Sequence, residues 1–444
     1  MKRVLFRVVA GVILLSSLEV ARAQQPGPPV GSASPAAASA TAGAGGGAFD
    51  PMAATRAYLA KVPPEKRARS DAYFEGGYWL ILWDFLYGAA IAVLLLYSGW
   101  SARMRDLAER VTRFKPVQSL LYWPQYAIVS FVLLFPLTYY EGFVREHQYG
   151  LATQTFGPWF GDQAKELLIS VVFGSVFVMI LYGVLRRAPR TWWIWGSCTT
   201  VVFIMFGALI APVWINPMFN KYTRLEDPKL RAPILSLARA NGITARDVYV
   251  VDASRQSTRV SANVSGFLGT DRISLNDNLL KRCSPAEIEA VMGHEMGHYV
   301  LNHAYKGILA FSVLVVLGFA FVRAFFDRLV FRWGEKWRVS GIGDLAGLPV
   351  LVLLISFYFF VLTPVTNTIT RTMEFEADMY GLNAARQPDG EAEVDLKLGE
   401  YRKLDPGPIE EFIFFDHPSG RVRILAAMRW KAEHLGASSP TSGP

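Results

Sequence analysis

Charged residues are scarce in this chain. Asp, Glu, Lys and Arg make up 18% of its 444 residues, whereas hydrophobic residues make up 52%. Soluble globular proteins are usually about 25% charged, and disordered chains are poor in apolar residues. The composition therefore argues against both classes and favours a polytopic membrane protein that carries a soluble part. The net charge is +8 without a long basic run, so we expect no nucleic-acid partner.

Cysteine is rare as well. The chain has only Cys198, in an apolar segment, and Cys283, in a polar one. Two cysteines cannot form a disulfide framework, and neither has a metal-ligating neighbour at close spacing. Cysteine usage therefore does not identify the redox compartment.

The N-terminus has the three parts of a secretory signal. Three basic residues within the first seven precede an apolar stretch over residues 8–18 and a small-residue cleavage site that ends at Ala23. An uncleaved membrane anchor over residues 1–23 is the alternative. Residues 24–70 begin with a stretch rich in Pro, Ala, Gly and Ser, and we expect them to form a disordered linker.

Six further apolar runs are long enough, or nearly so, to cross a hydrocarbon core of ~30 Å as helices. They cover residues 78–97, 121–140, 167–185, 191–210, 308–326 and 346–365. We expect four transmembrane helices within residues 71–215 and two within 308–366. A polar block over residues 216–307 separates the two groups. A second block over residues 367–444 follows them and ends in a disordered tail from about residue 435.

The first polar block has a mixed α and β pattern. It predicts a helix over residues 229–241, a buried strand over 248–251 and a β-hairpin within 259–275. Ser284 and Glu287 then form a capping box around a proline, which predicts the start of another helix.

That helix contains the sequence His294-Glu295-Met296-Gly297-His298. Residues i and i+4 project from one helical face, so the two imidazoles can bind one Zn²⁺. Glu295 can then serve as the general base that activates a water. With this composition the motif is expected roughly 0.007 times by chance. The alternative is a helix with two structural histidines.

A catalytic zinc needs a third protein ligand. His303 is nearest, but it lies about 140° around a continued helix from His298. Glu374 and Asp378 share a helical face directly after the sixth apolar run, so Glu374 would be the ligand. Asp378 would accept a hydrogen bond from a ligand histidine. Spacing alone leaves open an acidic helix start that is solvated by water.

These motifs together resemble the type I CAAX prenyl endopeptidases, the Ste-type integral-membrane zinc metalloproteases. The resemblance extends from about residue 78 to 430. Its stretches, in order, are residues 141–155, 250–267, 272–280, 294–303, 371–378 and 416–424. The chain departs from the family pattern at Ser261, Glu376 and Ser419, where Asn, Gln and Pro are common.

The resemblance implies a mainly α fold. A polytopic helical barrel would enclose an intramembrane chamber, and a small α+β zinc protease domain of the gluzincin type would close one end. It implies Glu374 as the third ligand, and His417 and Arg423 close to the substrate or to the developing oxyanion. A histidine before proline, as His417 is, is otherwise more often a helix-entry residue.

The resemblance also points to the strand that contains Ser261, Ala262 and Asn263. An extended substrate peptide could add to its edge as a further strand. The alternative is a hairpin that only completes the core.

We therefore expect an integral-membrane metalloendopeptidase with one Zn²⁺ per chain. Its substrates would be peptides or proteins, lipidated or membrane-inserted ones included, and it would contact membrane lipid. Two alternatives remain: a quality-control protease of the membrane without prenyl specificity, and a non-catalytic zinc-containing scaffold. An intact Glu295 argues against the scaffold, because a structural zinc site needs no general base.

The side of the membrane is a separate question. The loops after the first, third and fifth apolar runs carry five, three and four basic residues, whereas the loop after the second carries two. The positive-inside rule then puts the zinc domain outside the cytoplasm. Four basic residues within 61–69 and the family resemblance argue for the opposite side. We expect a bacterial inner-membrane protein whose zinc site faces the periplasm.

Overall fold

The computed structural model describes residues 49–265 and 271–435. The expected signal segment 1–23 and the tail after residue 435 lie outside the described residues. The longer helices are α4 (Pro64–Tyr97), α6 (Lys115–Tyr139), α8 (Phe156–Arg187), α9 (Trp192–Ile210), α13 (His303–Trp337), α14 (Leu348–Val361) and α15 (Thr363–Ala385). The shorter ones are α3 (Pro51–Ala60), α5 (Trp100–Val111), α7 (Arg145–Gln148), α10 (Pro228–Ala240), α11 (Asp277–Arg282), α12 (Pro285–Val300), α16 (Pro388–Leu398), α17 (Pro408–Phe414) and α18 (Gly420–Leu435).

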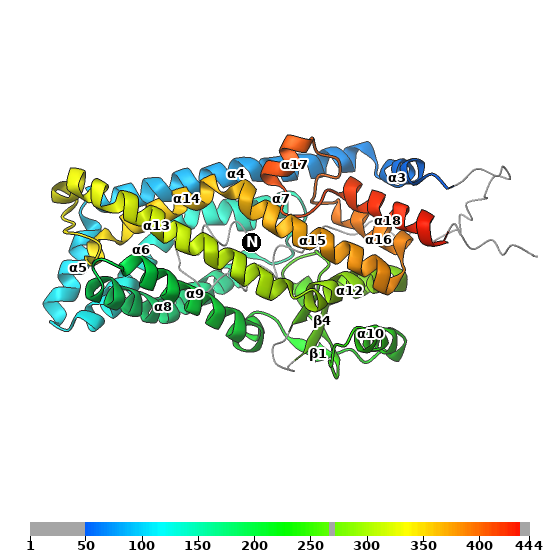
Figure 1. The fold of residues 1–444 in the computed structure, drawn as a ribbon, viewed down its shortest axis with the longest axis horizontal. Coiled ribbons are helices and arrows are strands. Elements are labelled where there is room, and N and C mark those ends of the chain that lie inside the picture. The colour runs from blue at the N-terminus through cyan, green and yellow to red at the C-terminus, as the bar shows by residue number, and fades with distance from the viewer. Residues whose placement is uncertain (1–48, 266–270, 436–444) are drawn as a thin grey trace, which may run out of the picture.

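Five helices of the described part are long and apolar enough to cross a membrane. Helices α4, α8 and α13 contain the first, third and fifth predicted runs, and the spans built on α6 and α9 contain the second and fourth. The long helices run along one axis, with α5 at one end and α12 towards the other (Figure 1). The predicted mainly α membrane fold is confirmed.

The sixth predicted run is not one straight helix. Helix α14 ends at Val361, α15 begins at Thr363, and the two are bent by 58°. Pro364 lies in the first turn of α15. Its ring lacks an N–H and clashes with the carbonyl four residues earlier, which favours a kink or a break in the helix at this point.

The described part of the linker is helical where we expected disorder. Helix α3 begins after Asp50, whose side chain accepts a hydrogen bond from the N–H of Met52. It packs against α16 and α18, and Tyr58 donates to Asp389 of α16 at 2.7 Å. Helix α4 already begins at Pro64. A proline-rich composition predicted a tether, but these tertiary contacts order the residues from 51 onward.

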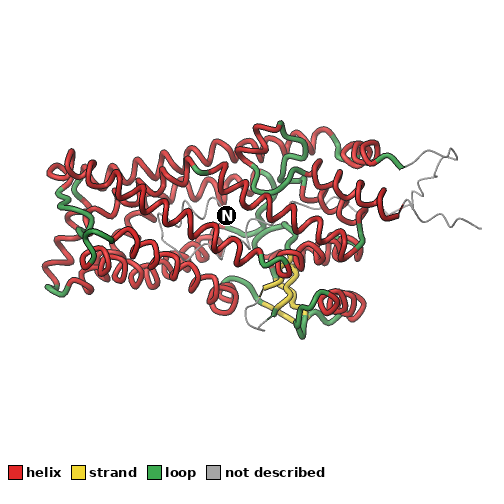
Figure 2. The backbone as a smooth tube through the Cα atoms, viewed as in Figure 1, coloured by secondary structure: helices red, strands yellow, loops and turns green. Residues whose placement is uncertain are grey.

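A small four-stranded sheet lies beside α12. Its strands are β1 (Tyr222–Arg224), β2 (Val248–Val251), β3 (Ala262–Ser265) and β4 (Arg272–Asn276), in the order β1-β2-β4-β3. Strands β3 and β4 are antiparallel and form the predicted hairpin, with Ala262 opposite Leu275. Figure 2 shows the strands as one small group among the helices. Strand β3 is therefore an edge strand, and it packs against α12.

Two apolar cores hold these parts together. The larger one lies between the long helices and includes Trp123, Phe177 and Phe326. The second lies between the sheet and α12 and includes Val248, Ile273 and Met296. Helix α12 is thus fixed from the sheet side by buried apolar side chains, which leaves its other faces to α15 and to the site.

Candidate metal centre

Helix α12 presents the first half of the site. Its start is the predicted capping box: Ser284 accepts from the N–H of Glu287, and the carboxylate of Glu287 accepts from the N–H of Ser284. His294 and Glu295 are both buried, and His298 is partly buried. The imidazole Nε2 atoms of His294 and His298 lie 3.1 Å apart. One face of α12 therefore offers two nitrogens at one point.

Helix α15 crosses α12 at very short range because both helices carry glycine there. A Cβ atom on Gly381 would lie 2.7 Å from the backbone N of His294, and one on Gly293 would lie 2.9 Å from the carbonyl of Gly381. A Cβ on Gly297 would lie 3.1 Å from Ala377. Only glycine permits this approach, and the approach brings Glu374 of α15 to the two histidines.

The three donors fit a metal ion. Glu374 Oε2 lies 3.3 Å from His294 Nε2 and 3.6 Å from His298 Nε2. Ligands at 2.0–2.1 Å from a tetrahedral zinc are about 3.3 Å apart. Glu374 Oε2 is also buried without a hydrogen-bond partner among the described residues. Two imidazole nitrogens and a carboxylate oxygen form a common donor set for catalytic zinc.

Each histidine is held through its other ring nitrogen. His294 Nδ1 lies 2.7 Å from Asp378 Oδ1, as the spacing of Glu374 and Asp378 predicted. His298 Nδ1 lies 2.9 Å from His303 Nδ1. With Nδ1–H donated in both cases, the two Nε2 lone pairs face Glu374. Such outer contacts fix the tautomer and the orientation of a metal-binding histidine.

The supporting role of His303 was missed from the sequence. Helix α12 ends at Val300, Asn302 adopts a left-handed conformation with φ 58°, and α13 begins at His303. This break turns His303 back to His298, so the angle calculated for one continued helix does not apply. His303 Nε2 in turn lies 3.0 Å from Glu376 Oε2. Asn after a helical run is a stop signal that could have revealed the turn.

Arg423 lies behind the metal centre. Its guanidinium donates to both oxygens of Asp378, at 2.9 and 2.5 Å. It also contacts Glu391 at 3.1 Å and Asp395 at 2.8 Å. The side chain is 7% exposed. We expected Arg423 close to the substrate or to the developing oxyanion, and it does line the cleft beside the donors. Its donors are engaged by these carboxylates, which also fits a role in supporting Asp378.

This cluster places three carboxylates around one guanidinium. Burial raises the pKa of Asp395 well above its usual value, although Arg423 opposes the shift. Burial also raises the pKa of Glu391, again against Arg423. Burial lowers the pKa of the His294 imidazole, but the neighbouring carboxylates of Asp378 and Glu374 outweigh burial and raise it.

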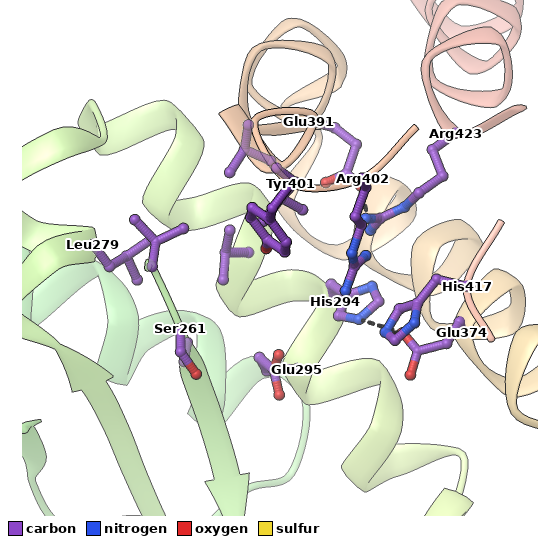
Figure 3. A pocket seen from close by; sticks show the side chains of 15 residues that line it. Ser261, Leu279, His294, Glu295, Glu374, Glu391, Tyr401, Arg402, His417 and Arg423 are labelled. Carbon is purple, nitrogen blue, oxygen red and sulfur yellow. Dashed lines mark hydrogen bonds and ion pairs between the residues drawn. The ribbon is translucent and has the colours of Figure 1, made fainter. Parts of the chain in front are cut away.

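Three of the remaining predicted residues border one cleft beside the donors. His417 Nε2 lies 3.3 Å from Glu374 Oε2, and its Nδ1 lies 2.9 Å from Asp416 Oδ1. Ser261 and Ala262, at the start of edge strand β3, line the same cleft with Glu295. Figure 3 shows Ser261 and Glu295 on one side of the opening.

Asn263 is not among the residues that line this cleft. It pairs with Ser274 across the hairpin and is partly exposed. Substrate contacts by the Asn263 side chain therefore have no support in this arrangement.

Comparisons with known proteins agree with this geometry. Residues 54–221 match the family described as CAAX prenyl protease N-terminal, five membrane helices, and residues 224–431 match peptidase family M48. The chain is 31% identical over 336 residues to the uncharacterized metalloprotease YhfN of Bacillus subtilis, covering 75% of this chain and 79% of that protein. It is 29% identical over 330 residues to CAAX prenyl protease 1 of Saccharomyces cerevisiae, covering 70% and 72%. The fold resembles the crystal structure of S. mikatae Ste24p, with a TM-score of 0.68, 22% identity, and coverage of 85% of this chain and 95% of that one.

Proposed function

Because the chain belongs to peptidase family M48, we propose that it is an integral-membrane endopeptidase that uses one Zn²⁺ per chain. The observation that carries the proposal is the convergence of His294, His298 and Glu374 within 4.8 Å of one another, beside Glu295. A buried general base next to such a donor set is needed for hydrolysis and has no use in a purely structural site.

A zinc ion held by these three side chains would acidify a water molecule and polarise the scissile carbonyl. Glu295 lines the same cleft as the donors. There it takes a proton from the attacking water and delivers it to the leaving amine. Asp416 orients the His417 ring through Nδ1, and an N–H at Nε2 would stabilise the developing oxyanion.

We propose an extended peptide as the substrate. Strand β3 has one neighbour in the sheet and borders the cleft at Ser261 and Ala262. A peptide that adds to this edge runs directly past Glu295. Several relatives carry the name CAAX prenyl protease 1. Because this chain also has membrane-length helices next to the site, lipidated and membrane-inserted peptides are the substrates to try first.

The test combines zinc content and cleavage on detergent-purified protein. Wild type and Glu295→Gln should both bind about one zinc per chain, and only wild type should cleave a lipidated peptide, because the substitution removes the base but keeps the ligands. Zinc in both proteins without cleavage of any membrane peptide would favour the scaffold. Absence of zinc from both would refute the assignment of the donors.

We further propose that the site faces the periplasm of a bacterial inner membrane. The basic loops next to α5, between α8 and α9, and after α13 lie together at the end of the molecule away from α12 (Figure 1). Twelve Lys and Arg residues belong to these loops and their flanks, and the positive-inside rule assigns such loops to the cytoplasm.

Cysteine labelling distinguishes the two orientations. Arg113→Cys marks the basic end and Arg429→Cys on α18 marks the other, in a chain whose own Cys198 and Cys283 are replaced by alanine. Both positions are exposed. In spheroplasts an impermeant maleimide should label Arg429→Cys at once and Arg113→Cys only after lysis. The reverse pattern would mean that the site faces the cytoplasm.

A further inference from the structure

The segment over residues 399–407, between α16 and α17, forms a wall of the cleft that the sequence did not reveal. Ser70 of α4 fixes it by donating to the carbonyl of Gly399 at 2.5 Å and to that of Arg402 at 3.2 Å. Tyr401 and Arg402 line the cleft from this segment. Figure 3 shows both on the opposite side of the opening from Ser261 and Glu295.

Tyr401 offers a hydroxyl that nothing in the described protein satisfies. The residue is only 4% exposed, and its hydroxyl has no hydrogen-bond partner among residues 49–265 and 271–435. A buried hydroxyl without a partner costs about 1–3 kcal/mol. Burial raises the pKa of Tyr401, so the group remains a neutral donor. Such a group at a cleft wall is ready for a ligand.

Arg402 differs from the other cations near the cleft. Arg423 contacts three carboxylates, Lys403 contacts Glu75 and Glu410, and Arg259 contacts Glu146. By contrast, the guanidinium of Arg402 makes no hydrogen bond or ion pair within the described part of the chain. It lies 5.7 Å from the centre of the Tyr401 ring, and its charge opposes the rise in the pKa of Asp395.

We propose that Arg402 and Tyr401 bind a carboxylate of the substrate peptide and thereby select which peptides the enzyme cleaves. The planar guanidinium matches a carboxylate with two parallel donors, and the tyrosine hydroxyl adds a third. The cleft also presents the acidic side chains of Glu295, Glu374 and Glu391, and its other guanidinium, Arg423, is engaged by three carboxylates. An anionic peptide group therefore needs a further cation at the wall. A peptide supplies a carboxylate from its own C-terminus or from an Asp or Glu side chain.

The inference rests on the proposed endopeptidase function. The test compares three peptides: one with a free C-terminal acid, the same peptide with a C-terminal amide, and an amidated peptide with Glu beyond the scissile bond. Wild type should prefer one of the two carboxylate peptides over the neutral one by roughly tenfold to hundredfold in kcat/KM, the usual range for a charge-assisted pair. Which one it prefers identifies the source of the carboxylate.

Substitutions then show whether Arg402 causes the preference for the carboxylate peptide. Arg402→Gln should bring the ratio close to one, and Arg402→Lys should restore part of it because the charge returns without the planar fork. Arg421→Gln is the matched control: it loses the same charge from an exposed site that pairs with Asp405, and the ratio should stay at the wild-type value. An unchanged ratio in Arg402→Gln would overturn the proposal.

Tyr401→Phe gives an independent readout. Because it deletes a buried hydroxyl without a partner, thermal stability should stay level or rise while kcat/KM for the carboxylate peptide falls several-fold. A loss of stability would mean that the hydroxyl serves the fold.

Fluorescence anisotropy measures the affinity of the Glu295→Gln variant for each peptide. These affinities test the carboxylate site separately from the endopeptidase function. If wild type cleaves nothing but Glu295→Gln binds the acid more tightly than the amide, the endopeptidase proposal fails and the carboxylate site stands. Equal affinities would overturn the carboxylate site.

Discussion

Replacing Arg423 with glutamine would distinguish support of the metal centre from participation in the reaction. The guanidinium contacts Asp378, Glu391 and Asp395 in a fully buried cluster. Removing one partner of a buried ion pair usually costs about 3–5 kcal/mol, because the other charge remains without compensation. For a domain of about 200 residues that corresponds to a fall of roughly 6–20 °C in Tm.

The same substitution should weaken zinc binding. Asp378 would lose both hydrogen bonds that fix its carboxylate, and this carboxylate holds Nδ1 of His294 at 2.7 Å. Loss of such an outer contact typically lowers metal affinity about 10–100-fold. Thermal unfolding in detergent and competition with a chelator measure the two effects separately.

Arg421→Gln is the control for Arg423→Gln. Arg421 lies two residues away on α18, its side chain is 52% exposed, and it pairs with Asp405 at 3.1 Å. A surface pair of this kind contributes about 0–1 kcal/mol, so Tm and zinc affinity should barely change. If Arg423→Gln kept wild-type stability and zinc affinity but lost kcat, Arg423 would act on the oxyanion. The hypothesis that Arg423 supports the metal centre through Asp378 would then be refuted.

Three further substitutions, with Gly183→Ala as a control for the first, test other parts of the site. Gly381→Ala should lower the free energy of unfolding by about 1–3 kcal/mol and weaken zinc binding, because its Cβ would lie 2.7 Å from His294 N. In Gly183→Ala, on α8, the added Cβ has no neighbour within 4 Å. The same unfolding assay should show a gain of up to ~1 kcal/mol for this variant. His303→Ala should lower zinc affinity about tenfold or more in a chelator titration, since His298 loses its Nδ1 partner; an unchanged affinity would contradict this support. The raised pKa of Asp395 means that the folded state is favoured while the carboxyl keeps its proton, so stability falls as pH rises through that pKa. Asp395→Asn should flatten this part of a Tm-versus-pH profile, and an unaltered slope would argue against a protonated Asp395.

Much of the architecture could be predicted because its signals are local. Apolar runs of about 20 residues predicted the membrane helices, and the capping box at Ser284 predicted the start of α12. The pair His294 and His298 needed only helical geometry. Glu374 lies far from them in sequence, so spacing made it a candidate ligand but left a solvated helix start open, and the family resemblance supplied the rest.

The contacts that hold the metal donors and form the cleft wall could not be predicted, because they depend on how segments far apart in the sequence pack together. His303 reaches His298 only through the left-handed turn at Asn302. Arg423 meets Asp378 because α18 packs against α15. Tyr401 and Arg402 lie in an irregular segment without a motif, and their position follows from an anchor on Ser70. None of these contacts leaves a periodic pattern in the sequence.

The order of the segments along the chain also has a consequence for biosynthesis. His294 and His298 leave the ribosome well before Glu374, and Arg423 follows His298 by 125 residues. At 5–20 residues per second the delay is about 6–25 s. For the first 76 residues of that stretch, until Glu374 is made, a nascent chain has the first two ligands and the general base but no third ligand. The three metal donors can therefore come together only after α15, which completes the last membrane-length segment, has been made.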